Sequence, residues 1–125
     1  MTLPEKIFAL RRLPLLADLS DGELAVLAEA SVERRFAAGE TVCAAGRPPA
    51  GLLFVCAGAV TDGDGVEAGG AAGAAALLFD RPPDAGLVAG PAGAQCLQIA
   101  RSDFFTLVRQ CPAIVVGLLV AAPPP

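Results

Sequence analysis

The chain has 125 residues, a net charge of −4 and no histidine. A chain of this length is expected to form one compact domain, residues 1–125. Its acidic balance and scattered basic residues argue against nucleic-acid binding. The absence of histidine removes the commonest near-neutral acid or base and the commonest metal ligand, which excludes many classes of enzyme.

Hydrophobic residues make up 54% of the chain but do not gather into a membrane-spanning segment. The longest apolar tract covers residues 113–122, which is about half the length that a transmembrane helix needs. The start of the chain has no basic stretch followed by an apolar one, so no signal peptide is predicted. We therefore expect a cytoplasmic protein that does not bind membranes.

Four cysteines lie far apart, each among apolar residues: Cys43, Cys56, Cys96 and Cys111. There is no C-x-x-C pair and no histidine to complete a zinc site. We expect reduced thiols that serve as small buried hydrophobic side chains. A disulfide between two of them is the alternative.

Two helices are predicted near the start, within residues 4–30. Pro4 suits a first helical turn and apolar residues follow it at helical spacing, which predicts a short helix up to Leu13. Ser20 and Glu23 form a capping-box pattern, in which each side chain satisfies a free backbone amide. The second helix is therefore expected over residues 21–30.

From residue 32 onward the pattern changes to short apolar or alternating runs between turn residues. These runs cover residues 32–36, 41–45, 52–57 and 95–100. Such close spacing predicts an antiparallel sandwich or barrel over residues 32–101. The low-complexity stretch at residues 68–76 is expected to belong to this unit, because residues 32–57 alone hold too few strands to close a sheet. Residues 62–65, DGDG, indicate a hairpin turn and not a calcium loop.

Two further helices are predicted after the strands, over residues 102–122. Ser102 and Asp103 are expected to open the first, and Pro112 the second. Three prolines at residues 123–125 end the pattern. The apolar run at 114–120 is expected to pack against the barrel, with homodimerisation through this helix as the alternative.

Three stretches share their order and spacing with a known family. Residues 13–20, LPLLADLS, resemble its entry motif. Residues 36–60, with FAAGETV, Gly46 and GLLFVCAGAV, resemble its glycine-punctuated strands, and residues 96–112 resemble its last strand and following helix. The family is that of the cyclic nucleotide-binding domains, and the match covers about residues 13 to 120.

The resemblance implies a mainly β fold, an eight-stranded jelly-roll barrel (a double-stranded β-helix) with helices at both ends. It also implies a role for three glycines. Gly39, Gly46 and Gly58 would occupy turns that need a positive φ or a close approach of the backbone.

Residues 73–89, GAAALLFDRPPDAGLVA, align with the phosphate-binding cassette of this family, G-E-x-A-L followed by R-P-R-x-A-T. In the family, backbone amides and an arginine hold the cyclic phosphate, and the glutamate accepts a hydrogen bond from the ribose. Here Gly73, the pair Ala76-Leu77 and the pair Arg81-Pro82 match the motif. The candidate ligand-binding residues of this degenerate cassette are Gly73, Ala74, Ala75, Ala76, Leu77, Arg81, Pro83 and Asp84.

The polar groups of the cassette are missing. Ala74 stands where the glutamate belongs, Pro83 where the phosphate-pairing arginine belongs, and Gly86 where a hydroxyl residue belongs. Asp84 adds a negative charge near the expected phosphate position. Arg81 is the remaining cation, and in the family the equivalent arginine usually faces outward.

We therefore expect a regulatory domain of signal transduction that has lost cAMP and cGMP binding and needs no cofactor. It would act as a non-catalytic interaction module for other domains or protein subunits. The alternative is a sensor that binds a cyclic nucleotide weakly, or another small ligand, through residues 73–77 and Arg81. An enzyme is disfavoured because the chain has no G-x-S-x-G motif, no Walker loop and no histidine to activate a nucleophile.

Overall fold

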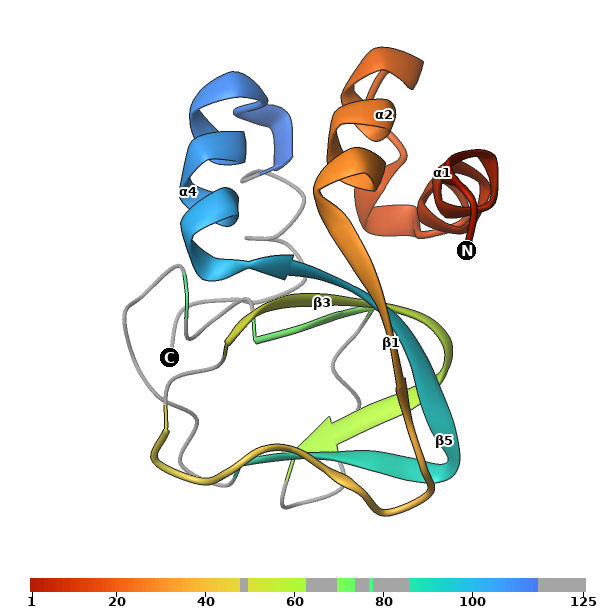
Figure 1. The fold of residues 1–125 in the computed structure, drawn as a ribbon, viewed down its shortest axis with the longest axis vertical. Coiled ribbons are helices and arrows are strands. Elements are labelled where there is room, and N and C mark those ends of the chain that lie inside the picture. Colours follow the sequence, from red (N-terminus) through yellow and green to blue (C-terminus); the bar gives the residue numbers. More distant parts are fainter. Residues whose placement is uncertain (48–49, 63–69, 74–76, 78–85, 115–125) are drawn as a thin grey trace.

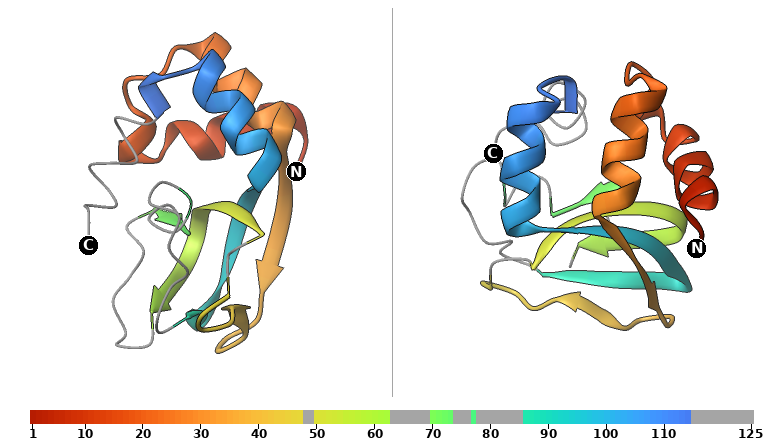
Figure 2. Two further views of the ribbon diagram at one scale, coloured as in Figure 1. Left: turned by 90° about the vertical axis from the view of Figure 1, so that its left-hand side faces the viewer. Right: turned by 45° about the horizontal axis from the view of Figure 1, so that its top comes forward.

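The computed structural model describes residues 1–47, 50–62, 70–73, 77 and 86–114. Its elements in chain order are α1 (Leu3–Arg11), the 3-10 helix η1 (Pro14–Leu16), α2 (Asp21–Ala30), β1 (Ser31–Phe36), β2 (Thr41–Cys43), β3 (Gly51–Asp62), β4 (Ala71–Ala72), β5 (Leu87–Ala100) and α4 (Arg101–Gln110). The helices stand together on one side of a strongly curved sheet (Figures 1 and 2). None of the helices in the described ranges is long and apolar enough to cross a bilayer.

Both N-terminal α-helices begin with a capping box. In α1, the amide of Glu5 donates to Thr2 Oγ1 and the amide of Thr2 donates to the Glu5 carboxylate. Ser20 and Glu23 exchange the same two bonds at the start of α2. The prediction for the second helix, residues 21–30, is confirmed, because the signal for its start lies within four neighbouring residues.

The first helix ends earlier than predicted. It stops at Arg11, and Leu13 has extended backbone angles (φ −81°, ψ 121°) before η1 begins at Pro14. The ring of Pro14 disfavours helical angles at the residue before it, so the helix cannot run on through Leu13.

The sheet is antiparallel and has β5 at its centre. The strand order is β1-β5-β3-β4, and β2 also pairs with β5. The fold that was expected, mainly β with flanking helices, is confirmed. Among the described residues the sheet has five strands and does not close into the eight-stranded barrel that the resemblance implies.

Strand β3 runs through Gly58, a position that was expected to be a turn. At Gly58 the strand β3 does not turn back in a hairpin but continues, and its pairing register with β5 shifts there. Its φ is +72°, and a Cβ there would lie 2.1 Å from the carbonyl oxygen of Gly93. Gly58 therefore bends a continuous strand by close backbone approach. Gly39 and Gly46 both have φ of +74°, as the resemblance implies for turn glycines.

Residues of the low-complexity stretch form part of the sheet. Ala71 pairs with Phe54, and Ala72 pairs with Leu53. The amide of Val55 donates to the carbonyl oxygen of Gly70 at 2.9 Å. Residues 70–72 are thus held to β3 by backbone contacts.

Two apolar clusters lie on opposite faces of the sheet, because neighbouring strand residues point to opposite sides. The helix-side core joins the sheet to the helices and includes Leu10, Leu24, Leu52, Phe54, Leu97, Ile99 and Phe104. The inner core consists of Phe36, Leu53, Val60, Ala72, Ala89, Ala94 and Cys96. The sheet is therefore covered by apolar packing on both faces.

Helix α4 differs from its prediction at the start. It begins at Arg101 with Ala100 as its N-cap, so neither Ser102 nor Asp103 caps it. Strand β5 runs directly into this helix, and the amide of Arg101 donates to the carbonyl oxygen of Ala50 at 3.1 Å. The carbonyl group of Ala50, the residue before β3, thus takes the place of the expected side-chain cap. After Pro112, residues 113 and 114 are helical, and the rest of the predicted last helix lies outside the described residues.

All four cysteines are free thiols, as predicted. Cys96 and Cys111 are buried, whereas Cys43 and Cys56 are only half-buried because each lies at the wall of a hollow. The prediction that the cysteines are buried is therefore wrong for these two.

Candidate functional site

The structure describes two of the candidate cassette residues, Gly73 and Leu77. Gly73 has φ of +85°, and the amide of Leu77 donates to its carbonyl oxygen at 3.1 Å. The side chain of Leu77 is buried in the helix-side core. Both residues therefore shape the backbone here. The other candidates lie outside the described residues: Ala74, Ala75, Ala76, Arg81, Pro83 and Asp84.

Gly86, at the end of the cassette, occupies a position that excludes a side chain. Its φ is +73°, in the left-handed region that favours glycine. A Cβ on Gly86 would lie 2.8 Å from the carbonyl oxygen of Cys43 and 2.9 Å from the amide nitrogen of Ala45. Both contacts are with backbone, so β2 would have to move before a hydroxyl residue could stand here.

A small cavity of about 100 Å³ lies between Gly73 and the inner core. Phe36, Leu53 and Leu87 supply much of its apolar wall. Pockets that bind drug-sized ligands usually have about 300–1,000 Å³. The cavity is thus small for a nucleotide. We call it the inner cavity.

One cation lines the inner cavity among the described residues. Arg34 Nη1 donates to Gln98 Oε1 at 2.6 Å, and its guanidinium carbon lies 5.3 Å from the centre of the Phe36 ring. Sequence reasoning missed Arg34 and Gln98. The alternation of Arg34 with Phe36 placed them on one face of β1, but only the pairing of β1 with β5 brings Gln98 to them.

The thiols of Cys43, Cys56 and Cys96 are not activated as nucleophiles. Burial raises the pKa of the Cys43 and Cys56 thiols, and it raises the pKa of Cys96 to about 11. A thiol with a raised pKa is protonated at neutral pH and is a poor nucleophile. These three side chains therefore contribute to packing and are not candidate nucleophiles.

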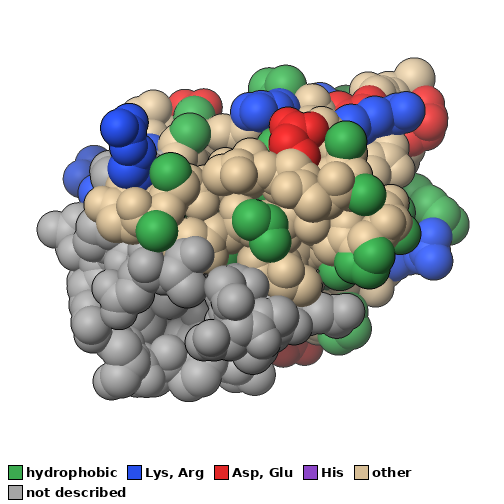
Figure 3. Space-filling view, turned by 90° about the horizontal axis from the view of Figure 1, so that it is seen from below, with side chains coloured by type: hydrophobic (Ala, Val, Ile, Leu, Met, Phe, Trp, Pro, Cys, Tyr) green, Lys and Arg blue, Asp and Glu red, His purple; other side chains and the backbone are tan. Residues whose placement is uncertain are grey.

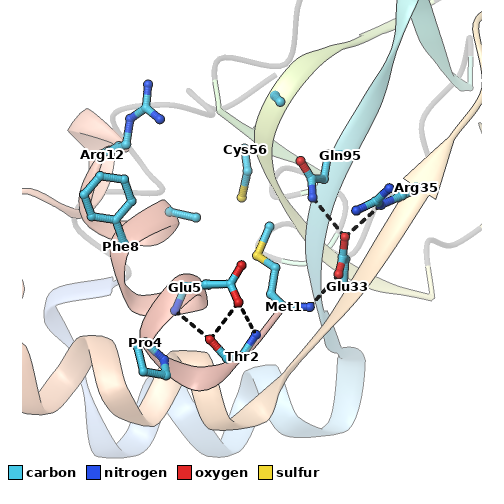
Figure 4. A pocket seen from close by; sticks show the side chains of 12 residues that line it. Met1, Thr2, Pro4, Glu5, Phe8, Arg12, Glu33, Arg35, Cys56 and Gln95 are labelled. Atoms are coloured by element: carbon cyan, nitrogen blue, oxygen red, sulfur yellow. Dashed lines mark hydrogen bonds and ion pairs between the residues drawn. The ribbon is translucent and has the colours of Figure 1, made fainter.

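A larger hollow of about 750 Å³, here called the outer groove, lies between α1 and the strands β1, β3 and β5 (Figure 4). Phe8 of α1 and Arg12, which directly follows α1, line one side, and Glu33, Arg35 and Gln95 line the other. Sequence reasoning missed it, because these residues come from three distant segments and no local pattern joins them.

Glu33 is the centre of a network in the outer groove. Its carboxylate accepts hydrogen bonds from the terminal amine of Met1 at 2.7 Å, Arg35 Nε at 2.8 Å and Gln95 Nε2 at 2.9 Å. The bond from the terminal amine, followed by those from Gln95 and Arg35, lowers the pKa of Glu33 to about 2. The carboxylate is therefore charged at any physiological pH.

On the side away from the helices, Lys and Arg side chains are scattered among the described residues (Figure 3). They do not merge into the continuous basic surface that a nucleic-acid backbone requires.

Comparison with solved structures identifies the fold. No protein-family model matches the sequence, and no curated protein matches it. The regulatory domain of Toxoplasma gondii PKA with cAMP superposes with a TM-score of 0.76 at 19% identity, over 91% of this chain and 47% of that one. The chain has the fold of cyclic nucleotide-binding domains.

Two other structures with this fold are similar. The regulatory subunit of a cAMP-independent protein kinase A from Trypanosoma cruzi, bound to guanosine, superposes with a TM-score of 0.77 at 23% identity, over 97% of this chain and 46% of that one. The N-terminal domain of a transcriptional regulator from Streptomyces coelicolor superposes with a TM-score of 0.62 at 29% identity, over 90% and 85%. The chain thus spans about half the length of the two kinase regulatory chains.

The cyclic nucleotide-binding fold does not by itself decide the ligand. One of these structures contains cAMP, and another, described as cAMP-independent, contains guanosine. What this chain binds has to be argued from its own residues.

Proposed function

We propose that this chain is a regulatory domain that has lost the binding of cAMP and cGMP and acts as a non-catalytic interaction module. Gly86 carries this proposal. The family motif places a hydroxyl residue at the position of Gly86, and the backbone of Cys43 and Ala45 leaves no room for a Cβ there. The hydroxyl group of the family motif is therefore missing at Gly86, and the neighbouring backbone leaves no space for a side chain that could restore it.

The other substitutions in the cassette act in the same direction. A charge-assisted hydrogen bond contributes about 1.5–3 kcal/mol, so Pro83 in place of the phosphate-pairing arginine removes a large part of the binding energy. Pro83 also has no amide to offer. Ala74 cannot accept from a ribose hydroxyl, and Asp84 brings a negative charge.

The inner cavity supports the same function. Its volume of about 100 Å³ leaves little space for a nucleotide beside Gly73 and Leu87. A domain of this fold can operate without cAMP, as the description of the Trypanosoma cruzi kinase subunit as cAMP-independent indicates. We infer that the partners of this chain are other domains or protein subunits.

Isothermal titration calorimetry with cAMP and with cGMP tests the proposal. We expect no binding heat from either nucleotide at about 1 mM. At this concentration even a weak dissociation constant of about 1 mM, which is a binding free energy of about 4 kcal/mol, would be detected. The regulatory domain of Toxoplasma gondii PKA, whose structure contains cAMP, is the positive control in the same buffer. A micromolar dissociation constant for either nucleotide would contradict the proposal.

A further inference from the structure

The outer groove has the size of a binding site and an aromatic side chain at its rim. Its volume of about 750 Å³ falls within the range of about 300–1,000 Å³ that is usual for binding pockets. Phe8 of α1 lines it and is 65% exposed. Exposed aromatic side chains beside a hollow are typical of protein interfaces, where they bury a large apolar area.

Both carboxylates in the groove are already bound within the fold. Glu5 accepts from Thr2 Oγ1 at 2.9 Å and from the Thr2 amide at 3.2 Å. Glu33 accepts from the terminal amine and from the side chains of Arg35 and Gln95. The charge of Glu33 is therefore offset by the terminal amine and Arg35, whereas Glu5 receives hydrogen bonds from neutral groups only. The lining holds three cationic groups, which are the terminal amine, Arg12 and Arg35, against these two carboxylates.

The two guanidinium groups of the groove keep donors for a ligand. Arg35 is bonded to Glu33 through Nε, its side chain is 76% exposed, and its Nη atoms have no partner among the described residues. The guanidinium carbon of Arg12 lies 5.9 Å from the centre of the Phe8 ring, and within the described residues Arg12 has no ion pair. Figure 4 shows the two groups on opposite sides of the groove, where an elongated ligand can meet both.

We propose that the outer groove docks an acidic, partly apolar segment of a partner protein. Carboxylates of the segment would accept charge-assisted hydrogen bonds from Arg12 and Arg35, and an apolar side chain would pack against Phe8. The groove is open to solvent and not an enclosed cavity. This favours an extended peptide, since small-molecule sites enclose most of their ligand. The inference rests on the proposed function, because an interaction module needs a surface for its partner.

Nuclear magnetic resonance of the uniformly ¹⁵N-labelled chain tests the inference. The probe is the terminally blocked peptide Asp-Glu-Asp-Leu-Leu-Asp-Glu-Asp, and the control peptide carries Asn and Gln in place of Asp and Glu. We expect the acidic peptide to shift the amide resonances of Phe8, Arg12, Arg35 and Cys56. The control peptide should leave these resonances in place.

Two charge-removing variants and one matched control complete the test. Arg12→Gln and Arg35→Gln are each expected to weaken peptide binding about tenfold, the loss expected for one charge-assisted contact. Arg109→Gln, which removes an exposed charge from α4, should leave the affinity unchanged. The spectrum of each variant without peptide shows whether it has folded.

Four results would overturn the inference. The first is that about 1 mM acidic peptide shifts no amide resonance, and the second is that the control peptide binds as tightly as the acidic one. The third is that all three variants bind the acidic peptide with the affinity of the unmodified chain. The fourth is that the groove resonances move with protein concentration alone, which would indicate a second copy of the chain as the occupant. Addition of cAMP to the same sample reports on the proposed function separately, because nucleotide binding would move the resonances of Gly73, Leu77 and Leu87 whatever the peptide does.

Discussion

Glu33 receives hydrogen bonds from three groups, two of which are far from it in the sequence. They come from the terminal amine, from Arg35 two residues along β1, and from Gln95 on β5. Because these bonds favour the charged carboxylate, they lower its pKa from an ordinary value of 4.5 to about 2. A single side chain therefore connects the start of α1 to two strands.

This network makes stability depend on pH. The pKa of Glu33 is lower in the folded state, so its stabilisation is present above a pH of about 4.5 and is lost as the pH falls to about 2. We expect Glu33→Gln to be less stable than the unmodified chain at neutral pH, and the difference to vanish towards pH 2. Urea unfolding followed by far-UV circular dichroism measures it. Glu29→Gln, on an exposed position of α2, is the control, and a difference for Glu33→Gln that is constant across the pH range would contradict the assignment.

The helices of this domain begin in two different ways. Helices α1 and α2 use capping boxes formed by residues within one helical turn. Helix α4 has no side-chain cap, and its first amide bonds to the carbonyl oxygen of Ala50 instead. The starts of α1 and α2 are therefore local features, whereas the start of α4 depends on how β3 and β5 are arranged.

Two serine substitutions distinguish a helix that starts with a side-chain cap, α2, from one that starts without it, α4. Ser20→Ala removes the cap of α2 and is expected to lower the free energy of unfolding by about 1 kcal/mol. Ser102→Ala is the matched control and should change it by less than about 0.5 kcal/mol, because the Ser102 side chain caps nothing. Chemical denaturation of both variants compares them. Equal losses would show that the assignment of the caps is wrong.

The whole molecule is organised by a sheet with an apolar cluster on each face. On β3, Phe54 belongs to the helix-side core and its neighbour Leu53 to the inner core. Because the helix-side core contains residues of both the helices and the sheet, the loss of one large side chain there weakens both layers. The structure is therefore expected to unfold as one cooperative unit.

Phe54→Ala tests this cooperativity. Phe54 is fully buried, so the cavity left by truncation is expected to cost about 3–5 kcal/mol. Val32→Ala, at a strand position that is 63% exposed, should cost less than about 0.5 kcal/mol. Thermal unfolding monitored by circular dichroism and by amide resonances of α2 and β5 should give one shared transition. If the resonances of α2 and β5 in Phe54→Ala were lost at different temperatures, the prediction of a single cooperative unit would be contradicted.

Much of the fold could be predicted from residues that lie close together in the sequence. The capping box at Ser20 and Glu23 marks its helix because both partners fall within one turn. Gly39 and Gly46 mark turns because glycine alone adopts a positive φ at little cost. These local signals, in their order along the chain, were enough to predict helices before and after a β unit and a resemblance to the cyclic nucleotide-binding domains.

Tertiary structure decided what depends on distant partners. Whether Gly58 ends a strand or bends it is determined by the backbone of Gly93, and why Gly86 cannot carry a side chain is determined by β2. The outer groove exists only because α1, β1, β3 and β5 meet, and spacing within any one of them does not show it. The sequence by itself thus determined the start of α2, the turn glycines Gly39 and Gly46 and the missing cassette groups, which are local. The strand pairing, the lack of room for a side chain at Gly86 and the placement of Arg12 and Arg35 on opposite sides of the groove follow from contacts between segments far apart in the chain.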